Sequence, residues 1–122
     1  RRLGRALGLK QLGVHLTTLP PGKESSMRHW HTRAEEFVYV LEGEVVLRTD
    51  AGEQLLAAGV CAGFPAGSGD GHQLINRSDR PAVYLEVGTN DEADAVSYPD
   101  VDMHYDPAVQ GGKFTRKDGT PY

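Results

Sequence analysis

The chain has 122 residues and carries 13 Lys and Arg residues against 17 Asp and Glu residues, which gives a formal net charge of −4. This length suits one domain with a single hydrophobic core. The negative charge argues against nucleic acid as a partner, and no apolar run approaches the roughly 18 residues that a membrane span needs. No signal peptide is apparent, although the sequence starts at Arg1 without a methionine, which leaves room for a trimmed N-terminal segment.

Short β-rich runs separated by turn signals follow one another along the chain. Turns at Gly43 and Gly52 fit hairpins, because glycine adopts positive φ at little steric cost. Strands of this length without helical periodicity predict an all-β sandwich or barrel. In chain order, the expected strands cover residues 12–19, 37–41, 45–49, 53–58, 60–64, 73–76 and 83–87.

The one cysteine, Cys61, has no partner for an intramolecular disulfide. A free thiol is compatible with a reducing compartment, so we expect a cytoplasmic protein. Because cysteine commonly behaves as a small hydrophobic residue, we interpret Cys61 as a buried strand residue rather than as a reactive thiol near a site.

Two histidines in the sequence His29-Trp30-His31 precede a pair of glutamates, Glu35 and Glu36. Successive side chains of a strand point to opposite faces, so the two imidazoles would share a face and could converge on one ion. A carboxylate and a third imidazole, from His72, would complete a mixed nitrogen and oxygen ligand set. Such a set suits zinc, iron, manganese or nickel. By contrast, we interpret the isolated His15 and His104 as surface or hydrogen-bonded core residues.

The spacing around the first histidine pair is regular. Six residues separate Gly22 from His29, four separate His31 from Glu36, and six more lead to Gly43. A second stretch has five residues between Gly59 and Pro65-x-Gly67, four before His72, and three before Asn76. Together these stretches, which cover residues 22–76, resemble the two sequence motifs of the cupin family. Between the first glycine and the first histidine the family usually has five residues, whereas this chain has six between Gly22 and His29. Before the later histidine the family usually has two residues, whereas this chain has four between Gly67 and His72.

The resemblance implies a fold and a ligand set. The fold would be a double-stranded β-helix, the jelly-roll barrel of cupins, formed by one domain over residues 1–122 with a motif core at 22–76. The ligands of one divalent ion per chain would be His29, His31, Glu36 and His72. Glu36 is preferred over Glu35 because its six-residue gap to Gly43 fits the family and because it shares the strand face of Val38 and Val40.

Short extensions flank the motif core, and the C-terminal one is acidic. It covers about residues 89–122, and no Lys or Arg occurs from Pro81 through Gly112. Such a stretch is typical of a solvated surface segment or tail. The first ten residues carry four cations and could pair with it, although exposed pairs contribute little stability. Within the core, the glycine-rich stretch 67–71 is either a lid or a long hairpin connection, and Asn76 is interpreted as a backbone support.

An inward-facing metal with open positions could bind a small polar or anionic molecule. The first hypothesis is a metal-dependent dioxygenase, isomerase or decarboxylase. The alternatives are a non-enzymatic module that binds or senses a small ligand, and a metal-stabilised structural protein; cupins host many functions, so the resemblance does not choose among them. We also expect a homodimer, in which the apolar residues Leu3, Leu7, Leu9 and Leu12 help to cover exposed strand edges.

Overall fold

Three antiparallel sheets build the computed structural model, which describes residues 1–108 and 112–121. The first sheet has the order β1 (Leu12–Leu19), β8 (Ala82–Thr89), β3 (Glu36–Glu42) and β6 (Cys61–Phe64). The second has the order β5 (Gly52–Ala57), β4 (Glu44–Thr49) and β7 (Gln73–Ile75). The third has the order β11 (Lys113–Thr115), β10 (Met103–Asp106), β9 (Val96–Tyr98) and β2 (Trp30–His31). A single turn of helix, α1 (Leu3–Ala6), precedes β1.

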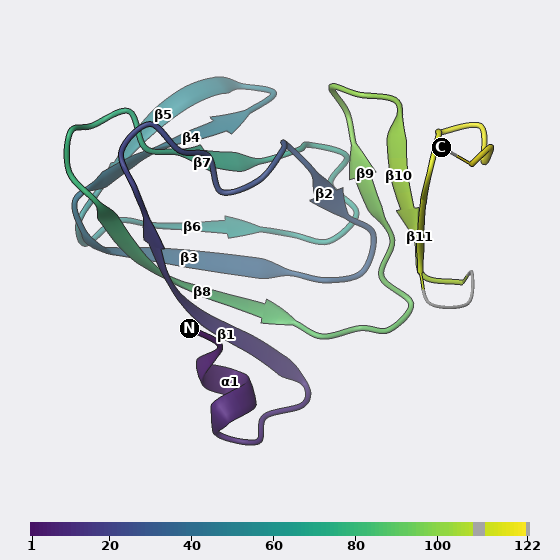
Figure 1. The fold of residues 1–122 in the computed structure, drawn as a ribbon, viewed down its shortest axis with the longest axis horizontal. Coiled ribbons are helices and arrows are strands. Elements are labelled where there is room, and N and C mark those ends of the chain that lie inside the picture. The colour runs from purple at the N-terminus through teal and green to yellow at the C-terminus, as the bar shows by residue number, and fades with distance from the viewer. Residues whose placement is uncertain (109–111, 122) are drawn as a thin grey trace.

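The first two sheets face each other, and the third stands at one end of them (Figure 1). Strand alternation explains which side chains lie between the sheets. In β3, Val38 and Val40 are buried, while Phe37 and Tyr39, which alternate with them, are exposed. Burying each aliphatic side chain of this kind contributes about 1.5–3 kcal/mol. The buried core comprises Leu19, Val38, Val40, Val45, Leu47, Leu56, Leu74, Ala82 and Tyr84.

The hairpin turn between β3 and β4 requires its glycine. Gly43 has a φ of 72°, in the left-handed region that other residues rarely adopt. A Cβ atom at this position would also lie 2.8 Å from the carbonyl oxygen of Pro81. This close approach lets the end of β8 pack directly against the turn.

All seven strands expected from the sequence are present, and their ends differ by no more than two residues from the predicted ones. The double-sheet β architecture predicted from the motifs is therefore confirmed. Among the described residues, no helix is long and apolar enough to cross a membrane.

The acidic C-terminal extension differs from the expected solvated tail. From residue 96 it forms β9, β10 and β11, because Val96, Tyr98, Met103 and Tyr105 supply residues suited to strands. Its residues 109–111 and 122 lie outside the described part of the chain. Among the described residues, the acidic segment forms ion pairs with Arg28 and Arg33. Its pairing with the cations of the first ten residues, within one subunit or between two, stays a prediction.

The expectation of a buried Cys61 is wrong. The thiol is exposed on β6. The reason is strand alternation, because Ala62 and Phe64 are the residues of this strand that pack against the core.

Candidate metal centre

The backbone brings the two motif histidine segments side by side. His29 and His72 form an isolated antiparallel bridge, in which each amide donates to the other carbonyl at 3.1 and 2.9 Å. His31 follows on β2, and Glu36 begins β3. The two additional residues before His72 are accommodated in the connection between β6 and β7, so they do not displace the histidine from its neighbours.

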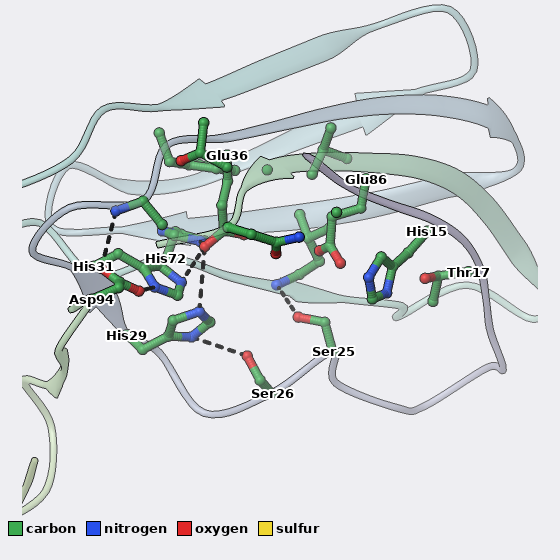
Figure 2. Close-up of a pocket in the computed structure, with 18 of the residues that line it drawn as sticks. His15, Thr17, Ser25, Ser26, His29, His31, Glu36, His72, Glu86 and Asp94 are labelled. Atoms are coloured by element: carbon green, nitrogen blue, oxygen red, sulfur yellow. Dashed lines mark hydrogen bonds and ion pairs between the residues drawn. The ribbon is translucent and has the colours of Figure 1, made fainter. Parts of the chain in front are cut away.

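Three imidazoles converge on one carboxylate oxygen (Figure 2). The Nε2 atom of His31 contacts Oε1 of Glu36, and the corresponding atoms of His72 and His29 lie 3.5 and 3.8 Å from the same oxygen. One ligand atom from each of His29, His31 and Glu36 lies within 4.8 Å of the others, a spacing compatible with a metal ion. His72 is not one of this group of three, and it joins the cluster through Nε2, 3.5 Å from Oε1 of Glu36. Glu35 is exposed on the opposite face.

Buried polar atoms in this cluster lack hydrogen-bond partners. Oε1 of Glu36 and both ring nitrogens of His72 are buried, and none makes a well-aligned hydrogen bond with the described residues. Leaving such groups unsatisfied costs about 1–3 kcal/mol each. A divalent cation among these nitrogen and oxygen donors would satisfy Glu36 and one nitrogen of His72, so the residues present fit a metal.

Neighbouring groups hold the imidazoles with Nε2 directed inward. Nδ1 of His31 lies 2.6 Å from Oδ2 of Asp94, and Nδ1 of His29 lies 2.9 Å from the carbonyl oxygen of Met27. Proton donation from Nδ1 to these oxygens leaves the Nε2 lone pair free for a metal. The ring of His72 is fixed differently, by stacking on Phe64 at a centroid distance of 3.8 Å.

Asp94 is itself held by the backbone. Its Oδ1 atom accepts hydrogen bonds from the amides of Arg33 and Ala34 at 2.9 and 3.0 Å. Burial raises the pKa of Asp94, but these amides and His31 outweigh it and lower the pKa overall. The sequence did not identify Asp94 as part of the site, because it lies 63 positions beyond His31 within the acidic extension.

Charge coupling shifts the protonation of the cluster. Burial lowers the pKa of His31, but the close contact with the Glu36 carboxylate and the hydrogen bond with Asp94 outweigh it and raise the pKa to about 9. Burial likewise raises the pKa of Glu36, whereas the three imidazoles together bring it well below its ordinary value. Without metal, an ionised Glu36 therefore faces a protonated His31.

Arg28 ties the surroundings of the centre together. Its guanidinium, whose side chain is 10% exposed, binds both carboxylate oxygens of Asp100 at 2.9 Å and Asp50 at 2.5 Å. It also donates to the carbonyl oxygen of Gly71 at 3.2 Å. Arg28, the residue before His29, thus fixes three segments in place: the β4–β5 turn, Gly71 before His72, and the β9–β10 connection.

The cluster lies in a cavity of about 610 Å³ that extends along the inner face of the first sheet. Glu86 and His15 line this cavity, although the sequence had not assigned them to a site. Burial is the largest cause of a raised pKa for Glu86, followed by the charge of Glu36. Asn76, by contrast, supports the backbone as expected, because its amide donates to the carbonyls of Leu19 and Arg80.

Comparison with known proteins identifies the family. Residues 15–88, which contain all four motif ligands, match a family model described as Cupin domain. The chain belongs to the cupin family. The comparison of this cupin with curated proteins found no match.

Solved structures resemble this cupin over almost its whole length. A sugar phosphate isomerase of the cupin superfamily from Silicibacter pomeroyi is 50% identical, with a TM-score of 0.95 over 99% of this chain and 77% of the other. A protein from Acidithiobacillus ferrooxidans, provisionally named a sugar phosphate isomerase, is 30% identical, with a TM-score of 0.91 over 100% of this chain and 78% of the other. The protein TT1209 from Thermus thermophilus is 38% identical, with a TM-score of 0.58 over 65% of this chain and 72% of the other.

Proposed function

We propose that this cupin is a metal-dependent isomerase of a small polar hydroxycarbonyl compound. One divalent ion would be held by His29, His31, Glu36 and His72. The observation that carries the proposal is the convergence of three imidazole nitrogens on one buried carboxylate oxygen inside a cavity large enough for a small molecule. The donor set suits a divalent ion such as zinc, iron, manganese or nickel, and it does not select one of them.

The reaction class is supported by the similarity to the Silicibacter pomeroyi isomerase at 50% identity. Isomerisation of a hydroxycarbonyl compound moves one proton from the carbon that bears the hydroxyl group to the neighbouring carbonyl carbon and a second proton from the hydroxyl oxygen to the carbonyl oxygen, so it needs no redox partner. A bound divalent ion would supply Lewis acidity toward the carbonyl oxygen. The residues of the chain would orient the donors through Asp94 and Met27 and exclude water from the buried side of the site.

Metal binding is tested by elemental analysis of protein purified without a histidine tag. We expect about one divalent ion per chain, a sharp loss of occupancy in His31→Ala, and full occupancy in Glu35→Ala. The latter is a matched control, since Glu35 precedes Glu36 but is exposed on the other face. Full occupancy of the His31→Ala protein would overturn the ligand assignment.

Activity is tested by incubating the metal-loaded protein with small aldoses, ketoses, carboxylates and diketones, following product formation and dioxygen uptake together. The isomerase proposal expects interconversion of an aldose and a ketose without dioxygen uptake, and loss of turnover in Glu36→Ala. Dioxygen uptake or release of carbon dioxide would favour a dioxygenase or a decarboxylase instead. Binding without any product would favour a sensing module.

A further inference from the structure

The inner face of the first sheet carries a bare patch of backbone beside the metal centre. Register places Glu36 of β3 opposite Gly88 of β8, and Gly88 opposite Gly13 of β1. Both glycines line the cavity, and neither has a positive φ, so turn geometry does not require them. A Cβ atom on Gly88 would lie 3.1 Å from the carbonyl oxygen of Glu35 and 3.6 Å from Cγ of Glu36. We name the backbone of Gly13 and Gly88 the glycine shelf; its lack of side chains leaves room for a ligand next to Glu36.

A polar wall borders the glycine shelf. Glu86 and His15 are directly opposed on β8 and β1, two residues further along each strand from the shelf. Opposed residues of antiparallel strands have Cβ atoms about 4.5–5.5 Å apart, so the two side chains border the same part of the cavity. Figure 2 shows both side chains on the cavity side of the sheet, with the carboxyl group of Glu86 between His15 and the three imidazoles in this view.

The charge of the cavity restricts what the wall can bind. No Lys or Arg occurs among the described residues that line it, whereas five carboxylates do: Glu36, Glu86, Asp91, Glu92 and Asp94. Arg33 pairs with Asp91 at 3.1 Å, His31 and two backbone amides hold Asp94, and the proposed metal would pair with Glu36, which leaves Glu86 and Glu92. The remaining carboxylates would repel a phosphate dianion that lies along the shelf, and no cation of the lining would compensate for its desolvation.

We propose that the glycine shelf, Glu86 and His15 form a subsite for the hydroxyl groups of an uncharged polyhydroxylated ligand, a sugar or polyol without phosphate, whose other end lies at the metal. The inference rests on the proposed function and names the substrate class of that site. A carboxyl group hydrogen-bonds with a hydroxyl group in either protonation state, and an imidazole both donates and accepts. Thr17, which also lines the cavity, adds a hydroxyl group from the same face of β1. The subsite thus offers hydrogen bonds without requiring a charge on the ligand.

The test is a titration of zinc-loaded, ¹⁵N-labelled protein followed by NMR, with D-xylose, D-glucose, D-ribose 5-phosphate and D-glucose 6-phosphate as probes. We expect the two neutral sugars to shift the amide signals of Gly13 and Gly88 and to bind at least tenfold more tightly than the two phosphates. In Glu86→Leu, sugar binding should weaken at least tenfold with zinc content unchanged. In Gly13→Ala, whose added Cβ meets no atom closer than 3.4 Å and so fits the fold, sugar binding should also weaken.

Glu42→Leu provides the matched control, because Glu42 is an exposed glutamate at the far end of β3 and does not line the cavity. It should bind the sugars as the unmodified protein does. Tighter binding of the phosphates, absence of binding by both neutral sugars, or unchanged affinity in Glu86→Leu would each overturn the subsite. Sugar binding through Glu86 without aldose–ketose interconversion would instead overturn the isomerase proposal alone, so the two failures are distinguishable.

Discussion

The imidazole of His31 is held at both ends of its ring, by Asp94 at Nδ1 and by Glu36 at Nε2. The carboxylate at Nδ1 fixes the tautomer and the orientation of the ring, which is how outer partners of metal ligands commonly act. Asp94 therefore determines whether the lone pair of Nε2 points into the centre.

Replacing Asp94 should weaken metal binding without removing a ligand. We expect Asp94→Ala to lower metal affinity by about 10–100-fold, because Nδ1 of His31 loses its partner. Asp94→Asn should lose less, since an amide oxygen still accepts the Nδ1 proton. Competition with a metal-chelating dye would measure both. The control is Asp91→Ala in the same loop, whose side chain contacts Arg33 rather than a histidine; an equal loss there would argue that the loop as a whole, rather than the Asp94 contact, matters.

Metal affinity should also depend on pH through His31. Its pKa of about 9 in the metal-free protein means that the imidazole is protonated at neutral pH and must release that proton to bind the ion. Affinity should therefore rise about tenfold per pH unit from pH 7 to pH 8 and level off above about pH 9. Titrations in metal-buffered solutions would measure this. A flat profile over this range would show that no protonated imidazole is displaced.

The same raised pKa has the opposite consequence for the stability of the metal-free fold. Because the folded pKa of His31 lies above the unfolded value of 6.5, its protonated form contributes stability fully below about pH 6.5, and this contribution is lost as pH rises through about 9. Metal-free and metal-loaded protein thus respond to alkaline pH in opposite directions.

At the residue scale, spacing and strand alternation together sufficed to choose four candidate ligands. Glu36 was separable from Glu35 because alternation relative to Val38 and Val40 places only one of them inside. Asp94 was not predictable, since its contact with His31 depends on the path of a loop. Glu86 could have been identified from strand alternation. It lies two residues from Tyr84 and therefore on the same inward face of the strand, and Tyr84 belongs to the core.

The elements of the barrel were predictable where alternation and turn glycines coincide. The strands of the third sheet were not, because each has four residues or fewer and two of them lie in an acidic stretch without cations. The fourth strand, β2, is two residues long and pairs with β9 through Trp30 and His31. Arg28 then fixes the β9–β10 connection through Asp100, a contact over 72 positions that no local pattern encodes.

Strand β5 offers a direct test of which face carries the stability. Leu56 is 1% exposed and its neighbour Leu55 is 57% exposed. We expect Leu56→Ala to lower the free energy of unfolding by about 2–5 kcal/mol, because it removes buried methylene groups and leaves a cavity. Leu55→Ala should change it by no more than about 0.5 kcal/mol. Urea denaturation measures both, and equal effects would contradict the assignment of the inner face.

At the scale of the whole molecule, apolar side chains remain exposed near the N-terminus. Leu7, Leu9 and Leu12 are 76%, 45% and 43% exposed, and they lie close to β1, which is an edge strand of the first sheet. Pairing of edges across a two-fold axis is a common way to cover such a surface.

We therefore expect a homodimer in solution. Light scattering at micromolar concentration should give twice the mass of the 13.3 kDa chain, and Leu7→Glu should shift the equilibrium toward the monomer, because it places a charge in the covered surface. A monomer mass for the unmodified protein would count against this expectation.

The proposed ligands and their support come from four separate stretches of chain, at residues 29–31, 36, 72 and 94, so the centre exists only in the folded protein. A metal that binds only the native state stabilises it by mass action, by about 2.7 kcal/mol when its free concentration is 100 times the dissociation constant. Adding a chelator should therefore lower the Tm measured by calorimetry. The His31→Ala protein should melt at the same temperature with and without chelator; a chelator effect of equal size there would place the stabilising metal elsewhere.

This linkage ties the supply of metal in a cell to the amount of protein that survives. A chain made when metal is scarce would spend more of its time unfolded, within reach of proteases, because small changes in stability alter steady-state abundance several-fold. Its turnover would slow as soon as the ion became available. The cellular level of the protein would then follow metal availability after translation, without any change in the transcription of its gene.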